Sequence, residues 1–136
     1  MARFAKVKPS FWRRKDLRVI GSLSKLLAIY LLTNENIRMT GLYRLSKHTI
    51  MHELDLDAAQ LKFALQELIA RDFCLYDEEE EVIWVVDMAL SQVAENPNEK
   101  QLKGIENELR DLADSDFPFV NEFLNRYENE FDLEIE

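Results

Sequence analysis

Residues 41–86 have the sequence GLYRLSKHTIMHELDLDAAQLKFALQELIARDFCLYDEEEEVIWVV, and this stretch decides the fold. Its first five residues alternate apolar with polar or aromatic side chains over too few positions for a helix, which predicts a short strand. Ser46 follows as the N-cap of a helix over residues 47–54, and Asp57 caps a stronger helix over residues 58–71. An apolar stripe on this second helix consists of Leu61, Leu65, Leu68 and Ile69. Because these residues recur every three or four positions, the stripe must face a core.

Two apolar segments that follow this helix predict a hairpin. Residues 73–76 and 82–86 are rich in β-branched and aromatic side chains, which favour strands. Between them lies Asp77–Glu81, a run in which every residue is acidic. We therefore expect an antiparallel hairpin with an acidic tip, which the short strand at 41–45 joins as a third strand.

Upstream of this stretch, residues 25–33 form a mostly apolar segment that predicts a largely buried helix. We expect Ser22 or Ser24 to cap this helix and Asn34–Asn36 to end it. The resulting order is helix, strand, helix, helix, strand, strand, which is the order of a winged helix-turn-helix. The sequence therefore predicts an α+β fold that is mainly helical, with a small three-stranded sheet.

The chain becomes acidic beyond the hairpin. Asn96–Asn98 predicts a turn, because proline fixes its own φ and asparagine tolerates unusual backbone angles. Residues 99–112 and 119–131 beyond this turn are typical of two acidic amphipathic helices. We expect a winged-helix domain over residues 1–90, with a basic N-terminal arm, and an acidic helical extension over residues 91–136.

The first of these C-terminal helices has an apolar stripe of its own. It consists of Leu102, Ile105, Leu109 and Leu112. A stripe of this kind needs a surface to cover, which is either its own domain or a second copy of the chain. The sequence slightly favours a homodimer.

Several segments share a pattern with a known family. They are Arg3–Trp12, Leu23–Leu27, Tyr30–Thr33, Gly41–Ser46, Val82–Val85, and Asn96–Asn98 with Lys103–Gly104 after it. These segments resemble the N-terminal winged-helix domain of phage replication proteins, the replisome-organizer and DnaD-like group. The resemblance runs over nearly the whole chain. It implies a DNA replication accessory or initiation protein, whose domain binds origin DNA or self-associates.

Charge is distributed unevenly along the 136 residues, which carry a net charge of -9. Residues 1–30 hold eight basic residues and one acidic residue, whereas residues 76–136 hold four basic and nineteen acidic residues. This balance excludes a uniformly basic nucleic-acid coat, but it leaves a basic arm that can neutralise phosphates. The candidate DNA-binding residues of the arm are Arg3, Lys6, Lys8, Arg13, Arg14, Lys15 and Arg18. A solvated or internally paired face is the alternative for these cations.

The rest of the predicted domain is poorly suited to DNA. The helix over residues 58–71 is the second helix of the predicted helix-turn-helix and would enter the major groove. Its groups that can read bases are only Gln60, Lys62, Gln66 and Arg71. The acidic tip would repel phosphates. If the fold contacts DNA, we expect it to use the arm together with Arg44, Lys47 and His48.

Phe11 and Trp12 lie within the arm. They are expected either to anchor it to the core or to stack on bases.

The acidic half of the chain supports a different hypothesis. Glu78, Glu79, Glu80 and Glu81 are candidate partner-binding residues. A chain that presents such a surface can act as a protein-interaction effector that mimics nucleic acid and inhibits a nucleic-acid-handling enzyme.

No motif in the sequence predicts catalysis, a cofactor or a metal. His48 and His52 share a helix face but lack further clustered ligands. Cys74 stands between apolar residues of a predicted strand, which favours a buried structural thiol, and one cysteine permits no internal disulfide. The sequence therefore predicts a non-enzyme. It also predicts a cytoplasmic protein, since it shows no secretory signal and no membrane span.

Overall fold

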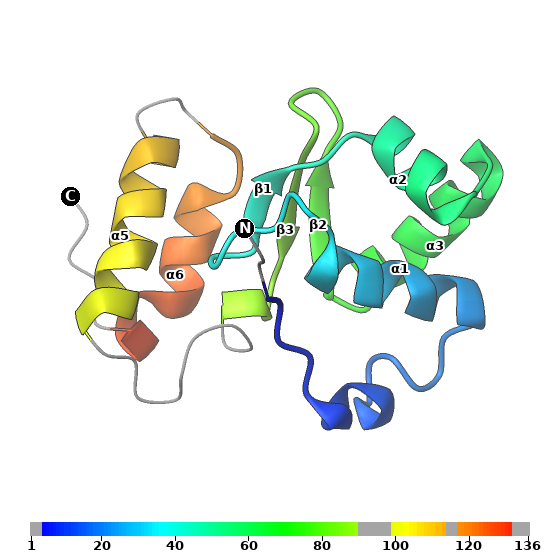
Figure 1. Cartoon of the computed structure of the whole chain (residues 1–136), viewed down its shortest axis with the longest axis horizontal. Coiled ribbons are helices and arrows are strands. Elements are labelled where there is room, and N and C mark those ends of the chain that lie inside the picture. Colours follow the sequence, from blue (N-terminus) through cyan, green and yellow to red (C-terminus); the bar gives the residue numbers. More distant parts are fainter. Residues whose placement is uncertain (1–3, 90–98, 114–116, 132–136) are drawn as a thin grey trace.

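A small three-stranded antiparallel sheet stands at the centre of the computed structural model, which describes residues 4–89, 99–113 and 117–131 (Figure 1). Its strands are β1 (Leu42–Arg44), β2 (Cys74–Asp77) and β3 (Val82–Val85). β3 is the middle strand, and it pairs with β1 on one side and with β2 on the other. The predicted α+β class, the hairpin and its third strand are confirmed.

Three α-helices cover one face of this sheet. They are α1 (Ser22–Thr33), α2 (Lys47–Leu54) and α3 (Ala58–Ala70), and a 3-10 helix, η1 (Pro9–Arg13), precedes them. α2 has the predicted bounds, and α3 ends one residue earlier than predicted. Leu61, Leu65 and Leu68 of the predicted stripe are buried against Tyr43 and Ile83 of the sheet, in the first of two hydrophobic cores. The stripe therefore holds α3 in place, as the sequence predicts.

Both predicted caps of this region are confirmed. The Ser46 hydroxyl accepts a hydrogen bond from the Thr49 backbone N–H at 3.1 Å. Asp57 accepts from the Gln60 backbone N–H at 2.7 Å, and the Gln60 side chain accepts from the Asp57 N–H at 3.0 Å. This reciprocal pair is a capping box, which satisfies two backbone donors at the start of α3.

The predicted cap of α1 is wrong. The helix begins at Ser22, so Gly21 is the N-cap residue, and no side chain caps the helix. Ser24 is buried instead, and its hydroxyl has no hydrogen-bond partner among the described residues. Burial of Leu17 and Ile20 just upstream brings the chain to the core early, so the helix starts three residues before the apolar segment.

Gly41 permits the close approach between the start of β1 and the end of β3. Its φ is +82°, and a Cβ there would lie 2.6 Å from the Val85 carbonyl oxygen and 2.8 Å from Met88 Cβ. The Gly41 carbonyl accepts a hydrogen bond from the Val85 N–H at 2.9 Å. A larger residue would therefore force the two strands apart.

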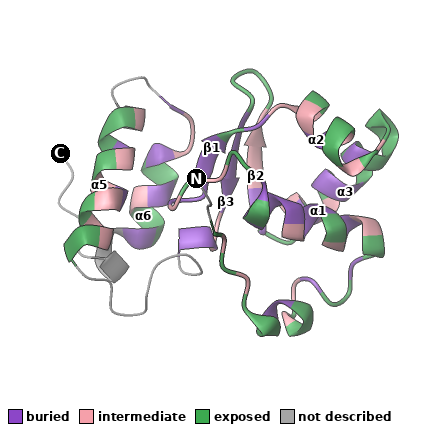
Figure 2. Cartoon of the chain, viewed as in Figure 1, coloured by how far each residue is buried: buried purple, intermediate pink, exposed green. Residues whose placement is uncertain are grey.

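The other face of the sheet is covered by α5 (Glu99–Ala113) and α6 (Val120–Phe131). Side chains along a strand alternate between its faces, so Leu42 and Trp84 point away from α1–α3. They form a second hydrophobic core with Ile105, Leu109 and Phe123. Figure 2 shows this arrangement, in which the sheet lies between two sets of helices with exposed outer surfaces, and β3 is buried while most of β2 is intermediate.

The apolar stripe of α5 is thus covered within the chain. Ile105 and Leu109 are buried, and Leu102 and Leu112 pack against the same second core. The stripe packs on the sheet of its own chain, so no second copy is needed to cover it and the homodimer is no longer favoured. The predicted turn at Asn96–Asn98 and the boundary near residue 90 lie outside the described residues.

Candidate nucleic-acid interface

Phe11 anchors the N-terminal arm (residues 4–18), and Trp12 does not. The Phe11 ring is 3% exposed and belongs to the first core, whereas Trp12 is 60% exposed. The two rings are perpendicular, with centroids 5.0 Å apart. Pro9 suits the first turn of η1 because it needs no N–H partner there. Neighbouring aromatic residues in the sequence therefore have different environments: one ring holds the arm, and the other faces solvent.

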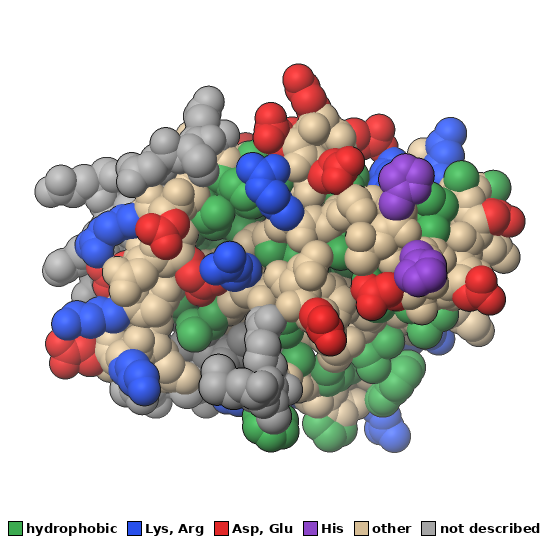
Figure 3. All heavy atoms as spheres, turned by 45° about the horizontal axis from the view of Figure 1, so that its top comes forward, with side chains coloured by type: hydrophobic (Ala, Val, Ile, Leu, Met, Phe, Trp, Pro, Cys, Tyr) green, Lys and Arg blue, Asp and Glu red, His purple; other side chains and the backbone are tan. Residues whose placement is uncertain are grey.

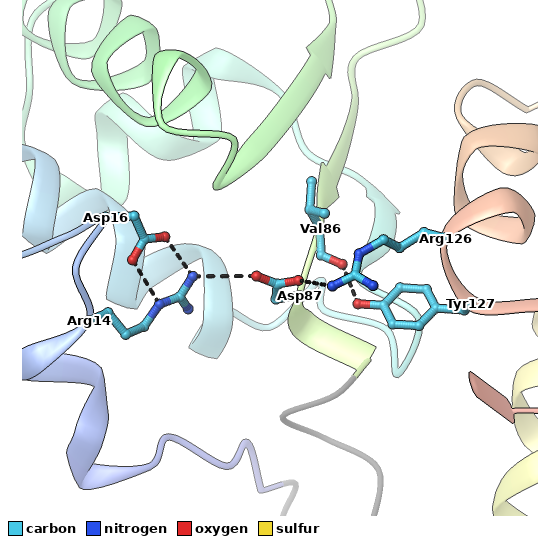
Figure 4. A network of polar contacts seen from close by, with 6 residues as sticks. All are labelled: Arg14, Asp16, Val86, Asp87, Arg126 and Tyr127. Carbon is cyan, nitrogen blue, oxygen red and sulfur yellow. Dashed lines mark hydrogen bonds and ion pairs between the residues drawn. The ribbon is translucent and has the colours of Figure 1, made fainter. Parts of the chain in front are cut away.

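Arg14 is the second anchor of the arm. Its guanidinium donates to both carboxylate oxygens of Asp16, at 3.1 and 2.7 Å. It also lies 3.6 Å from Asp87, which follows β3, and Asp87 in turn pairs with Arg126 of α6 at 3.1 Å (Figure 4). The same guanidinium lies over the Phe73 ring. Arg14 therefore links the arm to the end of β3, which agrees with the internally paired alternative for this cation.

The other described cations of the arm are exposed. They are Lys6, Lys8, Arg13, Lys15 and Arg18. The last four form no ion pair with any described residue. Arg3, the remaining candidate of the arm, lies outside the described residues. The arm therefore presents a basic surface to solvent, as expected.

A small hollow lies beside the arm. Its volume is about 100 Å³, and its polar lining consists of Lys6, Lys8, Ser10 and Arg14, with Phe11 among the apolar residues. Sequence reasoning missed this hollow because it forms only when the arm folds back on Leu32 of α1. Its lining combines cations with a hydroxyl group, which are the groups that bind phosphate oxygens.

Arg44 and Lys47, the other two DNA-binding candidates, are engaged by the acidic tip (Glu78–Glu81). Arg44 donates to the Glu80 backbone carbonyl at 2.8 Å and lies 3.6 Å from the Glu80 carboxylate. Lys47 pairs with the Glu78 carboxylate. The tip therefore neutralises both cations within the chain.

The tip has a defined turn conformation. The Asp77 carboxylate accepts the Glu80 backbone N–H at 2.8 Å, and Glu81 has a positive φ of 55°. The Glu81 carbonyl accepts from the Leu45 N–H at 2.9 Å, which joins the tip to the residue after β1. All four glutamates of the tip are exposed, and Figure 3 shows acidic side chains gathered around the projecting hairpin. The tip is a fixed acidic surface, and two of its four carboxylates pair with cations of the same chain.

The eight predicted DNA-binding residues that the structure describes fall into two groups. The arm contacts Asp87, which lies just beyond the C-terminal end of β3. Arg44 lies opposite Val82, the first residue of β3, in the strand register. The three residue steps of β3, at about 3.3 Å each, put roughly 10 Å between its two ends. Figure 1 shows the arm and the hairpin loop at opposite ends of the sheet. Arg44 and Lys47, which pair with the tip, therefore lie apart from the arm.

The surface of α3 offers few groups for reading bases. Gln60, Lys62 and Gln66 are exposed, but so is Phe63, at 60%. Lys62 and Gln66 line a groove of about 490 Å³ that lies between α2, α3 and Tyr76 of the hairpin, and the base of this groove is mostly apolar. The expectation of a weak recognition helix agrees with this surface.

Glu108 of α5 is a half-buried acid on a helix that the sequence predicts to be acidic and amphipathic. Burial raises the pKa of its carboxyl to about 7, although the nearby Arg38 and a backbone hydrogen bond from Met39 act in the opposite direction. One of its carboxylate oxygens has no hydrogen-bond partner among the described residues. The carboxyl faces the segment before β1, so no sequence signal within α5 could have revealed its burial.

The candidate metal and thiol residues have ordinary surroundings. His48 and His52 are exposed on α2, and no cluster of three metal-ligating side chains occurs among the described residues (Figure 3). Cys74 is buried, as predicted, and burial raises the pKa of its thiol to about 12. The thiol therefore stays protonated at neutral pH, which makes it a poor nucleophile.

Comparison of the chain with protein-family models, with curated proteins and with solved structures finds no match. Within the described residues, no helix combines the length and the apolar composition that a bilayer span requires.

Proposed function

We propose that this chain is a DNA-binding winged-helix module that serves in phage-type DNA replication, and that its N-terminal arm makes the contact. The observation that carries this proposal is the arm itself, in which Phe11 and Arg14 are fixed while neighbouring cations face solvent. An arm held in this way presents its charges to phosphates at a lower entropic cost than a free tail would.

The order of elements supports the winged-helix part of this proposal. Helix, strand, helix, helix, strand, strand, with the sheet order β1-β3-β2, is the arrangement expected of that class. α2 and α3 correspond to the helix-turn-helix, and the β2–β3 hairpin corresponds to the wing. The resemblance to the replisome-organizer and DnaD-like group adds the biological setting, which is DNA replication in the cytoplasm of a host cell. The chain would act there by binding DNA and not as an enzyme.

The usual contacts of a winged helix are unsuited to DNA in this chain. Phe63 occupies the exposed face of α3, and the acidic tip would meet phosphates with like charge. Arg44 and Lys47 are already paired with that tip. The arm is therefore the surface with the most favourable charge for DNA.

The alternative function is that of an acidic protein-interaction effector. Glu79 and Glu81 favour it, since both are exposed at the tip and form no ion pair with a described residue. The internal pairs of Glu78 and Glu80 weaken it, because those carboxylates already have cationic partners. A basic protein is the partner that this surface would bind.

Fluorescence anisotropy with labelled single- and double-stranded DNA at low salt tests the proposal. We expect the wild-type chain to bind, and Arg13→Ala/Lys15→Ala/Arg18→Ala to weaken binding by about 10- to 100-fold at roughly 0.1 M salt. Lys62→Ala is the matched control, because it removes an exposed cation from α3 and should change affinity less than about threefold.

Two outcomes would overturn the proposal. One is a wild-type chain that binds no DNA even at low salt. The other is DNA binding that Lys62→Ala weakens as much as the arm variant does. Absence of DNA binding together with capture of a basic protein through Glu79 and Glu81 would establish the effector function instead.

A further inference from the structure

We infer that the arm recognises single-stranded nucleic acid, with a base stacked on Trp12 and a phosphate in the adjacent hollow. This inference rests on the proposed function and names the class of nucleic acid that the arm prefers. It starts from the environment of Trp12, whose indole is 60% exposed and packs edge-on against the buried Phe11 ring.

Trp12 is a rigid platform rather than a flexible side chain on a loose tail. η1 holds its backbone, and Phe11 and Arg14 fix the residues on either side of it. A ring presented in this way offers its face to a partner at little entropic cost. Stacking of a base on such a face is tolerant of sequence, because every base has a π-face.

The hollow supplies the second half of the site. Phe11 lines it together with Lys6, Lys8 and Ser10, and the Trp12 ring lies 5.0 Å from Phe11 between ring centroids. The volume of about 100 Å³ is enough for a phosphate group. The arm therefore offers a flat ring for a base and a cationic hollow for a phosphate next to each other.

These features favour a single strand over a duplex. A base within a duplex has both faces covered by its neighbours, so an exposed indole has nothing to stack on unless the duplex opens. A single strand exposes its bases already. The cations that flank Trp12, Lys8 and Arg13, suit one phosphate backbone that passes along the arm.

The two tryptophans of the chain allow a direct optical test, because Trp12 is exposed and Trp84 is buried. Stacking on Trp12 should quench the exposed part of the tryptophan emission when an oligothymidylate of about 15 nucleotides is added. A duplex of the same length should bind without this quenching. Trp12→Leu should remove the quenching, and the signal that remains should be that of Trp84.

Affinity measurements on variants complete the test. By anisotropy, Trp12→Leu should weaken binding of the oligothymidylate by roughly 5- to 100-fold, which is the loss expected when one base no longer stacks on an aromatic ring. The same variant should leave duplex binding within about twofold of the wild type. Trp12→Phe should restore most of the single-strand affinity. Phe63→Leu is the matched control, because Phe63 is an aromatic ring with the same 60% exposure, on α3. Lys8→Ala should lower the salt slope for the single strand by about 0.7.

The outcomes separate this inference from the proposed function. If the arm variant abolishes all binding but Trp12→Leu weakens neither form of DNA, or both equally, the function stands and the stacking site is wrong. If Phe63→Leu weakens single-strand binding as much as Trp12→Leu does, the site is also wrong. If Trp12 emission responds to anionic phosphatidylserine vesicles and not to the oligothymidylate, the stacking site is wrong. If, in addition, neither form of DNA binds by anisotropy, the arm binds a lipid surface and both proposals fail.

Discussion

The two ends of β3 both carry ion pairs, yet these pairs affect the surface differently. At the end nearest the arm, Asp87 pairs with one arginine of the arm and with one of α6. At the other end, the acidic tip pairs with Arg44 and Lys47. The first set of pairs joins three elements of the fold and leaves the outer cations of the arm exposed. The second set cancels the cations next to it.

The comparison shows that the number of basic residues in a segment does not determine how much positive charge it presents. Arg14 and Arg44 were equivalent candidates in the sequence, but both use their guanidinium groups within the chain. The Lys8 ammonium and the Arg13 guanidinium stay at the surface. What decides the outcome is where the nearest carboxylate lies after folding.

The largest expected effect concerns the anchor of the arm. Phe11→Ala should lower the free energy of unfolding by about 3–5 kcal/mol, since it empties a buried aromatic site in the first core. Trp12→Ala should lower it by only about 0.5–1.5 kcal/mol, because the ring is mostly exposed and loses only its edge-on contact with Phe11. Urea denaturation monitored by circular dichroism measures both values. Equal losses for the two variants would mean that Phe11 does not anchor the arm.

The second prediction concerns Glu108 of α5, whose carboxyl has a raised pKa. Its folded-state pKa is about 7, so between about pH 4.5 and 7 the unfolded chain is ionised while the folded chain keeps its proton. The stability of the wild-type chain therefore falls as pH rises through this window. We expect Glu108→Gln to be more stable than wild type at pH 8, and to lose most of this advantage at pH 4.5.

Thermal melting at a series of pH values measures this difference. Asp111→Asn is the matched control, because Asp111 is exposed on the same helix. Its melting temperature should follow that of the wild-type chain at every pH. A Glu108→Gln advantage that stays constant with pH would show that the carboxyl does not titrate in this range.

The third prediction concerns Asp87, which pairs with both Arg14 and Arg126. Asp87→Asn should lower the free energy of unfolding by about 1 kcal/mol, the upper end for partly exposed ion pairs. Glu99→Gln, which removes an exposed i,i+4 pair with Lys103, should have a smaller effect. Identical losses in chemical denaturation would show that Asp87 does not link the elements that meet at this end of β3.

The smallest expected effect concerns the acidic tip. Glu78→Gln/Glu80→Gln should strengthen DNA binding by about two- to fivefold at roughly 0.1 M salt, because it removes the carboxylates that neutralise Lys47 and Arg44. Arg44 keeps its hydrogen bond to the Glu80 backbone carbonyl in this variant. Glu79→Gln/Glu81→Gln removes the same amount of charge from the same tip without breaking an ion pair. Anisotropy should show a smaller gain for this second variant. An equal gain would mean that only long-range repulsion matters.

Much of the fold could be predicted because its signals are local. Ser46 and Asp57 cap helices from positions that the sequence shows directly, and the hairpin strands follow from their β-branched and aromatic residues. The bounds of α2, α3, α5 and α6 agree with the predicted ones within about one residue. These elements depend on periodicity and turn chemistry that a short window contains.

The site could be predicted only in part, because its chemistry depends on residues far apart in the sequence. Arg14 meets Asp87 from 73 positions earlier in the chain, and Glu108 is partly covered near the segment that holds Arg38. Phe11 and Trp12 are neighbours with similar side chains, so their different exposure follows from the path of the arm over α1 and not from their types. A sequence window contains none of these contacts.

The salt dependence of DNA affinity tests the central claim, which is that the arm, and not the acidic tip, supplies the phosphate contacts. The slope of log affinity against log salt should be measured for the wild-type chain, for Arg13→Ala/Lys15→Ala/Arg18→Ala and for Glu78→Gln/Glu80→Gln. The arm variant should have a shallower slope than the wild type, by up to about 2.7 for duplex DNA or 2.1 for a single strand, while the tip variant keeps or steepens it. A wild-type slope that the arm variant reproduces unchanged would contradict the account.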